Sequence, residues 1–213
     1  MSACPRCSAQ LETPLGCGSC GALLAPSPSP TPFEVFGLVA SFDVDVDLLK
    51  RRLLKLSRIV HPDFFAGGDA ATREAAERAS ALLNEAYAVL ADPGARADWL
   101  VLALGGPKEN ERREMPKAFL LDVFEWNEVL DAAREAGVGT RERAALAQLE
   151  TTLRAQRAEV VEQLGRMLTP APPRNSAALN DVRAQLNSLR YIDRTLEQIA
   201  ALKLDQATSQ GTK

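Results

Sequence analysis

The chain has 213 residues and a formal net charge of −3, with 46% hydrophobic but only 5% aromatic residues. This length allows one large or two small domains, and the negative charge argues against a nucleic-acid binder. Alternating β-type patterns are scarce, so the predicted fold class is all-α. No apolar run reaches the roughly 18 residues of a membrane span, and no signal or transit peptide pattern is seen. We therefore expect a cytoplasmic protein without a membrane partner.

Residues 1–25 contain all four cysteines, arranged as two CxxC pairs separated by nine residues. Each pair can bring two thiolates to one metal ion, and two pairs complete a tetrahedral shell of four sulfurs. Gly18 and Gly21 would let the backbone curl tightly around these sulfurs. A segment this short has almost no core, so metal binding would supply most of its folding free energy. The predicted ligands of one structural zinc ion are Cys4, Cys7, Cys17 and Cys20.

Other interpretations use the same four cysteines. Iron in a rubredoxin-like site would have the same ligand set, and zinc is preferred only because it is commoner. Two redox disulfides are disfavoured because neither CxxC pair follows a predicted strand and opens a helix. A catalytic zinc is disfavoured because four sulfurs leave no open position. Residues 26–32, a Pro/Ser-rich linker, are predicted to be stiff and to isolate this zinc knuckle or ribbon from the rest of the chain.

From residue 33 the pattern becomes helical. A short apolar segment over 33–40 precedes a helix predicted over 46–60, with Asp45 as its N-cap. The predicted buried stripe of this helix is Leu49, Leu53, Leu56 and Val60. Arg51, Lys55 and Arg58 repeat at the same interval but lie about 200° away around the axis. The helix is therefore expected to pack on one side and to expose a row of cations on the other.

His61, Pro62 and Asp63 follow this helix, and His61 is the only histidine of the sequence. Pro62 disfavours helical geometry at the residue before it, so the helix should end at His61 and the chain should turn. A single histidine excludes a multi-histidine metal site, and any Ser-His or Cys-His catalytic pair would have to use it. We expect this side chain to be presented outward. No phosphate-binding glycine loop accompanies the helices, so no enzymatic activity is predicted.

Asp69 is predicted to cap a long Ala-rich helix that ends near Leu90 and packs antiparallel to the first. Its predicted inner face consists of Ala75, Ala79, Leu82, Ala86 and Val89. The sequence Asp92-Pro93-Gly94 should break this helix, and a short helix over 97–104 should follow. Residues 33–106 are thus interpreted as one domain built on a helical hairpin, followed by a linker over 107–115.

Residues 116–205 predict an antiparallel three-helix bundle, with a flexible tail over 206–213. The first helix should span 116–136 and stop at Gly137-Val138-Gly139. The second should run from Thr140, its N-cap, to about Leu168, and a Pro-rich loop over 170–173 should lead into the third. The predicted seams are Leu146, Leu149, Leu153, Val160 and Leu164 on the second helix, and Leu179, Val182, Leu186, Leu189, Leu196 and Ile199 on the third.

The first of these three helices carries two apolar faces, which is more than a three-helix bundle needs. The face assigned to the core consists of Phe119, Val123, Trp126 and Leu130. The second face consists of Leu120, Leu121 and Phe124, with Glu125 and Glu128 beside it. We expect this second face to form an exposed patch, and such patches mark partner sites.

Residues 33–104 resemble a J-domain, and residues 33–204 resemble more specifically the HscB co-chaperone family of iron–sulfur cluster biogenesis. The motifs that carry the resemblance are Phe33-Glu-Val-Phe-Gly-Leu38, His61-Pro-Asp-Phe-Phe65, Asn84-Glu-Ala-Tyr87, Arg96-Ala-Asp-Trp-Leu100 and Phe119-Leu-Leu-Asp-Val-Phe-Glu-Trp-Asn-Glu128. Some members of that family, including the metazoan ones, carry an N-terminal two-CxxC zinc module like residues 4–20. The resemblance implies an L-shaped molecule that acts as an adaptor rather than an enzyme.

The resemblance also implies two binding surfaces. The J-domain would dock on the ATPase domain of a DnaK-class chaperone similar to HscA and stimulate its ATP hydrolysis. The residues implied for this contact are His61, Pro62, Asp63, Lys50, Arg51, Lys55 and Arg58. The C-terminal bundle would bind an iron–sulfur cluster scaffold protein similar to IscU. The residues implied for that contact are Leu120, Leu121, Phe124, Glu125, Glu128 and Tyr191.

Two positions depart from the family pattern. Ala132 stands where the family has a further acidic residue, so the resemblance does not carry that contact over to this chain. Phe64 stands where many J-domains have lysine after the tripeptide, which leaves the turn less basic.

Two other functions are considered. In the first, a general J-domain chaperone would hold unfolded clients with its C-terminal bundle. In the second, a zinc ribbon would bind nucleic acid and the helices would serve as an oligomerisation arm. The second is disfavoured because Arg6 is the only basic residue of the ribbon, which has no aromatic side chain to stack on bases.

Overall fold

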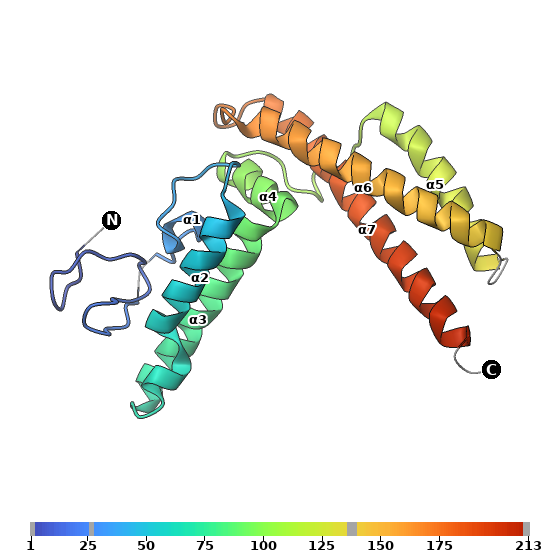
Figure 1. Ribbon diagram of the computed structural model, residues 1–213. Coiled ribbons are helices and arrows are strands. Elements are labelled where there is room, and N and C mark those ends of the chain that lie inside the picture. The colour runs from blue at the N-terminus through green and yellow to red at the C-terminus, as the bar shows by residue number, and fades with distance from the viewer. Residues whose placement is uncertain (1–2, 26–27, 136–139, 211–213) are drawn as a thin grey trace. The chain divides into compact units, whose positions relative to one another are not determined.

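The structure is a computed structural model that describes residues 3–25, 28–135 and 140–210 (Figure 1). It divides into two compact units, Met1–Leu100 and Val101–Lys213. The secondary structure of the described residues consists of helices and isolated β-bridges, as the all-α prediction requires. Among the described helices, none combines the length and the apolar character that crossing a membrane requires.

The helices of the first unit begin where local capping chemistry places them. Asp45 accepts a hydrogen bond from the Leu48 N–H at 2.9 Å, and Asp69 accepts one from the Thr72 N–H at 2.8 Å, which confirms both predicted N-caps. The elements are α1 (Pro32–Val35), α2 (Val46–Val60), the 3-10 helix η1 (Pro62–Phe65), α3 (Ala70–Ala91) and α4 (Pro93–Ala103), which ends in the second unit.

The short helix α4 begins earlier than predicted, at Pro93 rather than Ala97. The Asp92 carboxylate accepts a hydrogen bond from the Ala95 N–H at 2.7 Å, as an N-cap does. Pro93 takes the first helical position, where the missing N–H costs no hydrogen bond. The same residues therefore end α3 and start α4.

The inner face of α3 differs in part from the prediction. Its buried residues are Ala76, Ala79, Leu83, Ala86 and Leu90. Ala75, Leu82 and Val89 are only partly buried. An Ala-rich helix has apolar side chains on adjacent faces, so its sequence does not select one of them. The packing of α1 and α2 against α3 makes that selection.

Several motif residues of the first unit lie in its core. The ring of Phe33 packs on that of Trp99 with centroids 5.1 Å apart. The guanidinium of Arg96 donates to the Phe42 carbonyl at 2.6 Å and lies 5.3 Å from the centroid of the Phe42 ring. Desolvation lowers the pKa of Arg96, against the opposing effect of Asp92 and Asp43. These residues stabilise the hairpin rather than form its binding surface.

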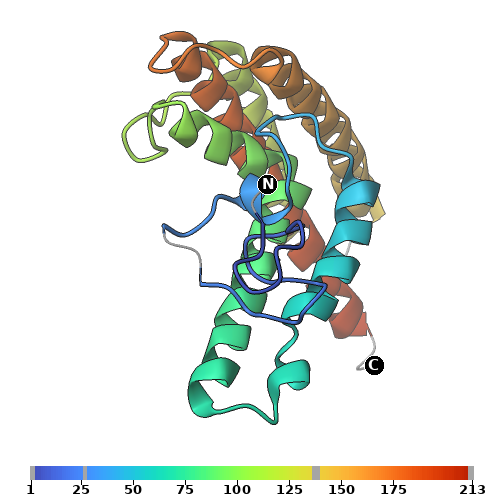
Figure 2. The same ribbon diagram turned by 90° about the vertical axis from the view of Figure 1, so that its left-hand side faces the viewer.

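The N-terminal loops lie against α2 in both views (Figures 1 and 2), contrary to the predicted isolation by a stiff linker. A Cβ added to Gly16 would lie 2.9 Å from Cγ2 of Ile59, and one added to Gly18 would lie 3.3 Å from its Cδ1. The Glu12 carboxylate also forms an ion pair with Lys55 at 2.6 Å. The absence of a side chain at Gly18 therefore permits the cysteine loop to approach α2 closely. The predicted role of Gly18 was different, namely to let the backbone curl around the sulfurs.

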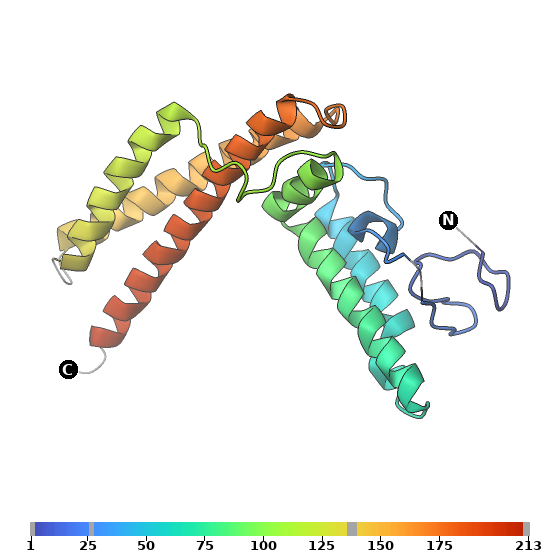
Figure 3. The same cartoon turned by 180° about the vertical axis from the view of Figure 1, so that it is seen from behind.

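The second unit contains α5 (Lys117–Glu135), α6 (Thr140–Leu168) and α7 (Ala178–Gln210), packed as the predicted bundle (Figure 3). Most of the predicted seam residues are buried, and Val160 and Leu196 pack partly buried against the same core. The predicted stop at Gly137-Val138-Gly139 lies outside the described residues. The third helix continues to Gln210, beyond its predicted end at Asp205.

Buried polar side chains of α7 hold the segment over 107–115. The Arg183 Nε donates to the Pro107 carbonyl at 2.8 Å. The Asn187 Nδ2 donates to the carbonyls of Arg112 and Glu114, both at 2.9 Å. This segment, expected to be a linker, is thus fastened to α7, because buried carbonyls need donors.

Candidate functional site

The two CxxC pairs adopt the same local conformation. In each, the N–H of the first cysteine donates to a carbonyl further along the loop, and a later N–H donates back to the carbonyl of that cysteine. These bonds are Cys4 N–H to Ala9 (2.8 Å), Ser8 N–H to Cys4 (2.9 Å), Cys17 N–H to Ala22 (2.9 Å) and Gly21 N–H to Cys17 (2.9 Å). Ser8 and Gly21 both have positive φ, 59° and 68°. The second pair places glycine at this left-handed position, as predicted for Gly21, whereas the first holds a serine there.

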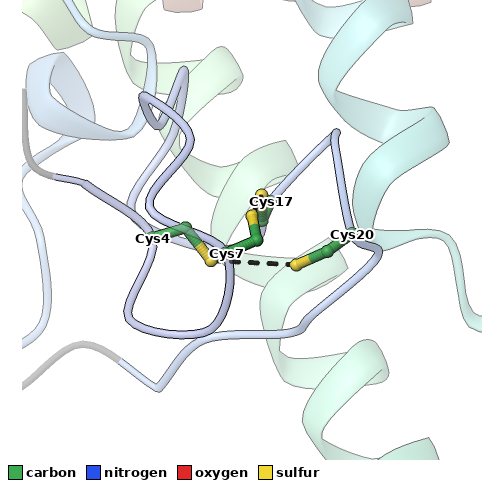
Figure 4. Close-up of side chains that lie close together, drawn as sticks. All are labelled: Cys4, Cys7, Cys17 and Cys20. Carbon is green, nitrogen blue, oxygen red and sulfur yellow. Dashed lines mark hydrogen bonds between the residues drawn. The ribbon is translucent and has the colours of Figure 1, made fainter.

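The four sulfurs converge between the two loops (Figure 4), within 4.8 Å of one another. The Sγ atoms of Cys4 and Cys20 are 3.8 Å apart, and those of Cys7 and Cys17 are 3.7 Å apart. A tetrahedral metal ion with metal–sulfur bonds of about 2.3 Å has sulfur–sulfur edges of about 3.8 Å. The donor set therefore fits one metal ion with four thiolate ligands and no open position.

The thiols of this cluster differ in pKa. Backbone N–H groups of Cys20 and Ser19 stabilise the thiolate of Cys17 and lower its pKa to about 6. At Cys7 the N–H of Ala9 acts in the same direction, but the neighbouring thiols and burial outweigh it and raise the pKa to about 12. Cys17 therefore ionises more readily than Cys7. A bound cation would allow all four to be thiolates at neutral pH.

The His-Pro-Asp turn has a defined geometry and is exposed, as predicted. His61 has φ −64° and ψ 129°, which ends α2, and Pro62 begins η1. The imidazole Nδ1 accepts a hydrogen bond from the Asp63 N–H at 3.3 Å. The side chains of His61 and Asp63 are 50% and 89% exposed. Because Nδ1 is an acceptor, the neutral ring carries its proton on Nε2, which can donate to a partner.

The cations predicted on α2 are exposed, but two of them already lie beside a carboxylate of the chain. Lys50, Arg51, Lys55 and Arg58 all lie on the surface. Lys55 forms the ion pair with Glu12 of the cysteine loops, and Lys50 lies 3.9 Å from the neighbouring Asp47. The cationic row therefore borders the four-cysteine cluster, a proximity that no periodicity in the sequence indicates.

Two exposed apolar side chains lie next to these residues, and neither was predicted to belong to the binding surface. Leu54 is 68% exposed and Phe64 is 70% exposed. Leu54 lies between Arg51 and Arg58 on the same helical face, and the Phe64 ring meets the His61 ring edge-on with centroids 6.2 Å apart. The signal was available for Leu54, because it falls outside the buried leucine stripe and within the row of cations.

The surplus face of α5 is exposed as predicted. Leu120, Leu121 and Phe124 are 40%, 71% and 70% exposed. Glu125 and Glu128 are also exposed on this helix, and so is Ala132. Trp126 and Leu130, on the opposite face, are buried in the core of the unit. The helix thus presents an apolar patch bordered by carboxylates.

Tyr191 connects α7 to α5. Its ring lies 6.1 Å from that of Phe119 and 6.2 Å from that of Trp126, measured between centroids. Its hydroxyl is 3.2 Å from the Asn127 Nδ2, which donates to it. Asn127 is three residues after Phe124, on the same side of α5. Tyr191 is therefore partly buried and lies at the edge of the apolar patch.

Comparisons with known proteins agree with this arrangement. A family model described as the HSCB C-terminal oligomerisation domain matches residues 115–200. The human iron–sulfur cluster co-chaperone protein HscB is 30% identical over 190 residues, which cover 88% of this chain and 75% of the human protein. The HscB homolog of Bordetella avium is 39% identical over 132 residues, 61% of this chain and 77% of that protein.

Two solved structures have the same fold. The crystal structure of human HscB matches with a TM-score of 0.74 and 28% identity, covering 95% of this chain and 99% of the human one. The chaperone HscB from Vibrio cholerae matches with a TM-score of 0.68 and 25% identity, covering 83% and 99%.

A helical hairpin with an exposed His-Pro-Asp turn and a three-helix unit with a C-terminal HscB signature define a J-domain co-chaperone. The relatives are named co-chaperones rather than enzymes. The chain belongs to the HscB family of iron–sulfur cluster co-chaperones.

Proposed function

We propose that this protein binds an IscU-like iron–sulfur cluster scaffold through its C-terminal unit and delivers it to an HscA-like chaperone of the DnaK class. The J-domain then stimulates ATP hydrolysis by that chaperone. The protein itself is an adaptor without catalytic residues and acts in the cytoplasm. The relatives' names support the co-chaperone role, and the chemistry of the two exposed surfaces supports the two kinds of partner.

The exposed turn at His61 is the observation that carries the chaperone contact. Its backbone is fixed by Pro62 and by the hydrogen bond from the Asp63 N–H to the imidazole. The two side chains are therefore displayed in one geometry, and little conformational entropy is lost when a partner binds. The adjacent cations, Arg51 and Arg58 among them, would steer this turn toward an acidic surface.

The test is a steady-state ATPase assay with the partner chaperone, with and without scaffold. His61→Gln should abolish stimulation while circular dichroism remains unchanged, because the exposed ring contributes no core contact. Arg73→Gln, which removes an exposed charge from α3, serves as the control and should stimulate like the parent. Full stimulation by His61→Gln would overturn the J-domain assignment.

The scaffold contact is proposed for the apolar patch of α5, with Glu125, Glu128 and Tyr191 around it. A small apolar patch bordered by carboxylates suits one folded partner with matching chemistry better than a range of unfolded chains. This favours a dedicated scaffold over the general-chaperone alternative. Capture from a lysate distinguishes the two, since a general chaperone would recover a broad mixture of polypeptides.

Calorimetric titration with the scaffold protein tests the patch itself. Leu121→Ala combined with Phe124→Ala should lower the affinity at least tenfold without loss of helicity, because both side chains are largely exposed. A matched control is Leu204→Ala, which truncates another exposed leucine of the same unit. Unchanged affinity in the double variant would remove this surface from the proposed function.

We assign zinc to the four-cysteine cluster, in a structural role. The four sulfurs match the geometry of a closed tetrahedral site, and zinc is the commonest ion in such sites. When bound, the metal would supply folding free energy to loops that have little core of their own. Elemental analysis of the purified protein tests this assignment against iron.

A further inference from the structure

We propose that a pocket lined by Arg113, Arg190 and Arg194 binds an acidic segment of the same partner whose apolar residues contact α5. This inference rests on the proposed function, because it assigns a second contact to the proposed scaffold. The pocket is lined by arginines, whereas the patch of α5 is bordered by carboxylates.

The pocket lies in the second unit, between α7 and the segment over 107–115. Its volume is about 450 Å³, and its lining includes Glu109, Arg113, Asn187, Arg190, Tyr191 and Arg194. The hydrogen bonds from Asn187 to the carbonyls of Arg112 and Glu114 fasten this segment on both sides of Arg113. The wall that carries Arg113 is thus fixed to α7.

The pocket has an excess of positive charge. Three arginines and one glutamate line it, and the glutamate, Glu109, contacts two of the arginines. Glu109 pairs with Arg190 and lies 3.7 Å from Arg194. One carboxylate therefore orients two guanidinium groups and neutralises only part of their charge. Guanidinium groups held in this way bind a further carboxylate in a defined geometry.

Asn187 adds a second polar group to the pocket. It is 8% exposed, and its Oδ1 has no hydrogen-bond partner among the described residues, whereas its Nδ2 donates twice. Those two bonds fix the amide orientation, so Oδ1 is left as an acceptor. A buried acceptor without a donor is costly. This oxygen is shielded inside the wall of the pocket, so the exposed arginines are the groups that carboxylates of a peptide would bind.

Tyr191 makes the pocket continuous with the apolar patch of α5. It lines the pocket, and its hydroxyl accepts from Asn127 of α5. Leu120, Phe124 and Asn127 follow one another on one side of α5 at helical spacing. A partner that covers this patch would therefore reach the pocket with a neighbouring segment. Charge complementarity specifies that segment as acidic.

The test is a calorimetric titration of the full-length protein with the IscU-like scaffold at about 50 mM and about 500 mM salt. The test variant is Arg113→Glu with Arg194→Glu. The control is Arg143→Glu with Arg166→Glu, which changes the net charge equally at two exposed α6 positions of the same unit. Circular dichroism checks that both variants fold.

We expect the test variant to bind about tenfold more weakly than the parent at low salt, with a smaller difference at high salt. The control should stay within about twofold of the parent. Equal losses in both variants, or no loss in either, would overturn the proposal. So would a test variant that changes self-association in sedimentation without changing scaffold affinity, because the occupant would then be a second copy of the chain.

The same titration separates this inference from the proposed function. If the parent binds, and Leu121→Ala with Phe124→Ala weakens binding while the arginine variant does not, only the pocket assignment fails. If the parent does not bind the scaffold at all, the proposed function fails and the pocket assignment fails with it.

Discussion

The helices α2 and α5 both bury one face and expose another, but they expose opposite chemistry. On α2 the exposed side chains are cations around Leu54, next to the turn at His61. On α5 they are leucines and a phenylalanine bordered by carboxylates. One surface suits an acidic partner and the other an apolar one, in agreement with the two different contacts proposed above.

The two surfaces also differ in what surrounds them. The four-cysteine loops lie on α2 and pair Glu12 with Lys55, whereas the patch of α5 is bordered by Tyr191 of the neighbouring helix α7. The α2 surface is therefore bordered by loops with little core of their own, and the α5 surface by a helix of the packed bundle. The following experiments would break or sharpen this contrast.

Metal removal should have the largest effect, and only on the α2 side. Metal binding contributes about 10–16 kcal/mol to folding in zinc-finger peptides. A chelator, or Cys17→Ser, should therefore unfold residues 3–25 and expose Ile59, while α5–α7 keep their protection. Amide hydrogen exchange measures both regions, and Ser19→Ala in the same loop is the control. Protection of residues 3–25 that survives chelation would contradict the metal assignment.

The two faces of α5 should respond very differently to truncation of an aromatic side chain. Trp126 is 4% exposed and Phe124 is 70% exposed. We expect Trp126→Ala to lower the free energy of unfolding by about 3–5 kcal/mol, and Phe124→Ala to change it by less than about 0.5 kcal/mol. Urea denaturation followed by circular dichroism measures both. Similar losses in the two variants would mean that Phe124 contributes to the core.

Removing the charge of Glu12 should strengthen the α2 contact moderately. Glu12→Gln breaks the ion pair with Lys55 and frees that cation for an acidic partner. Exposed ion pairs are worth about 0.2–1 kcal/mol, so the affinity for the chaperone's ATPase domain should rise about two- to fivefold at low salt. The control is Glu77→Gln on α3. A weaker complex would show that Glu12 itself contacts the chaperone.

The smallest effect is expected within the C-terminal bundle, away from both surfaces. Glu150 of α6 accepts hydrogen bonds from Lys203 of α7 and from Arg154. Both bonds lower the pKa of Glu150, and the bond from Lys203 has the larger effect. Glu150→Gln should lower the free energy of unfolding by about 0.5 kcal/mol at neutral pH.

The pH dependence of that effect follows from the direction of the shift. Because the folded pKa lies below the unfolded one, the stabilisation is present above the unfolded pKa and is lost as the pH falls through the folded pKa. Denaturation curves of variant and parent should therefore converge in acid. A difference that persists at low pH would point to lost packing rather than lost charge.

Helix termini were largely predictable because their causes are local. Asp45 and Asp69 each accept a hydrogen bond from an N–H three residues later, and Pro62 acts on the residue before it. Each signal lies within one turn of the backbone that it affects. The start of α4 was predicted four residues too late, at Ala97 instead of Pro93. The cause is again local, since Asp92, which ends α3, also caps α4.

Buried faces were predictable only where apolar residues form one stripe. The seam of α6 was correct because Leu146, Leu149 and Leu153 are the large apolar residues over 140–155 and lie on one face of the helix. On α3 alanines occupy several faces, and the choice of Leu83 over Leu82 depends on the helices packed against it. The periodicity of the sequence alone does not determine which of the two leucines is buried.

The sequence by itself determined the helical class, most helix limits and the outward His-Pro-Asp turn, because each depends on near neighbours in the chain. It also determined the clustering of four thiols, because that depends on the spacing of one residue type. Only the tertiary structure decided that Glu12 meets Lys55, that Gly18 faces Ile59, and that residues 107–115 are fastened to α7. These contacts join residues far apart in the chain through single side chains. A single pair leaves no repeating pattern in the sequence, so only the packed structure reveals it.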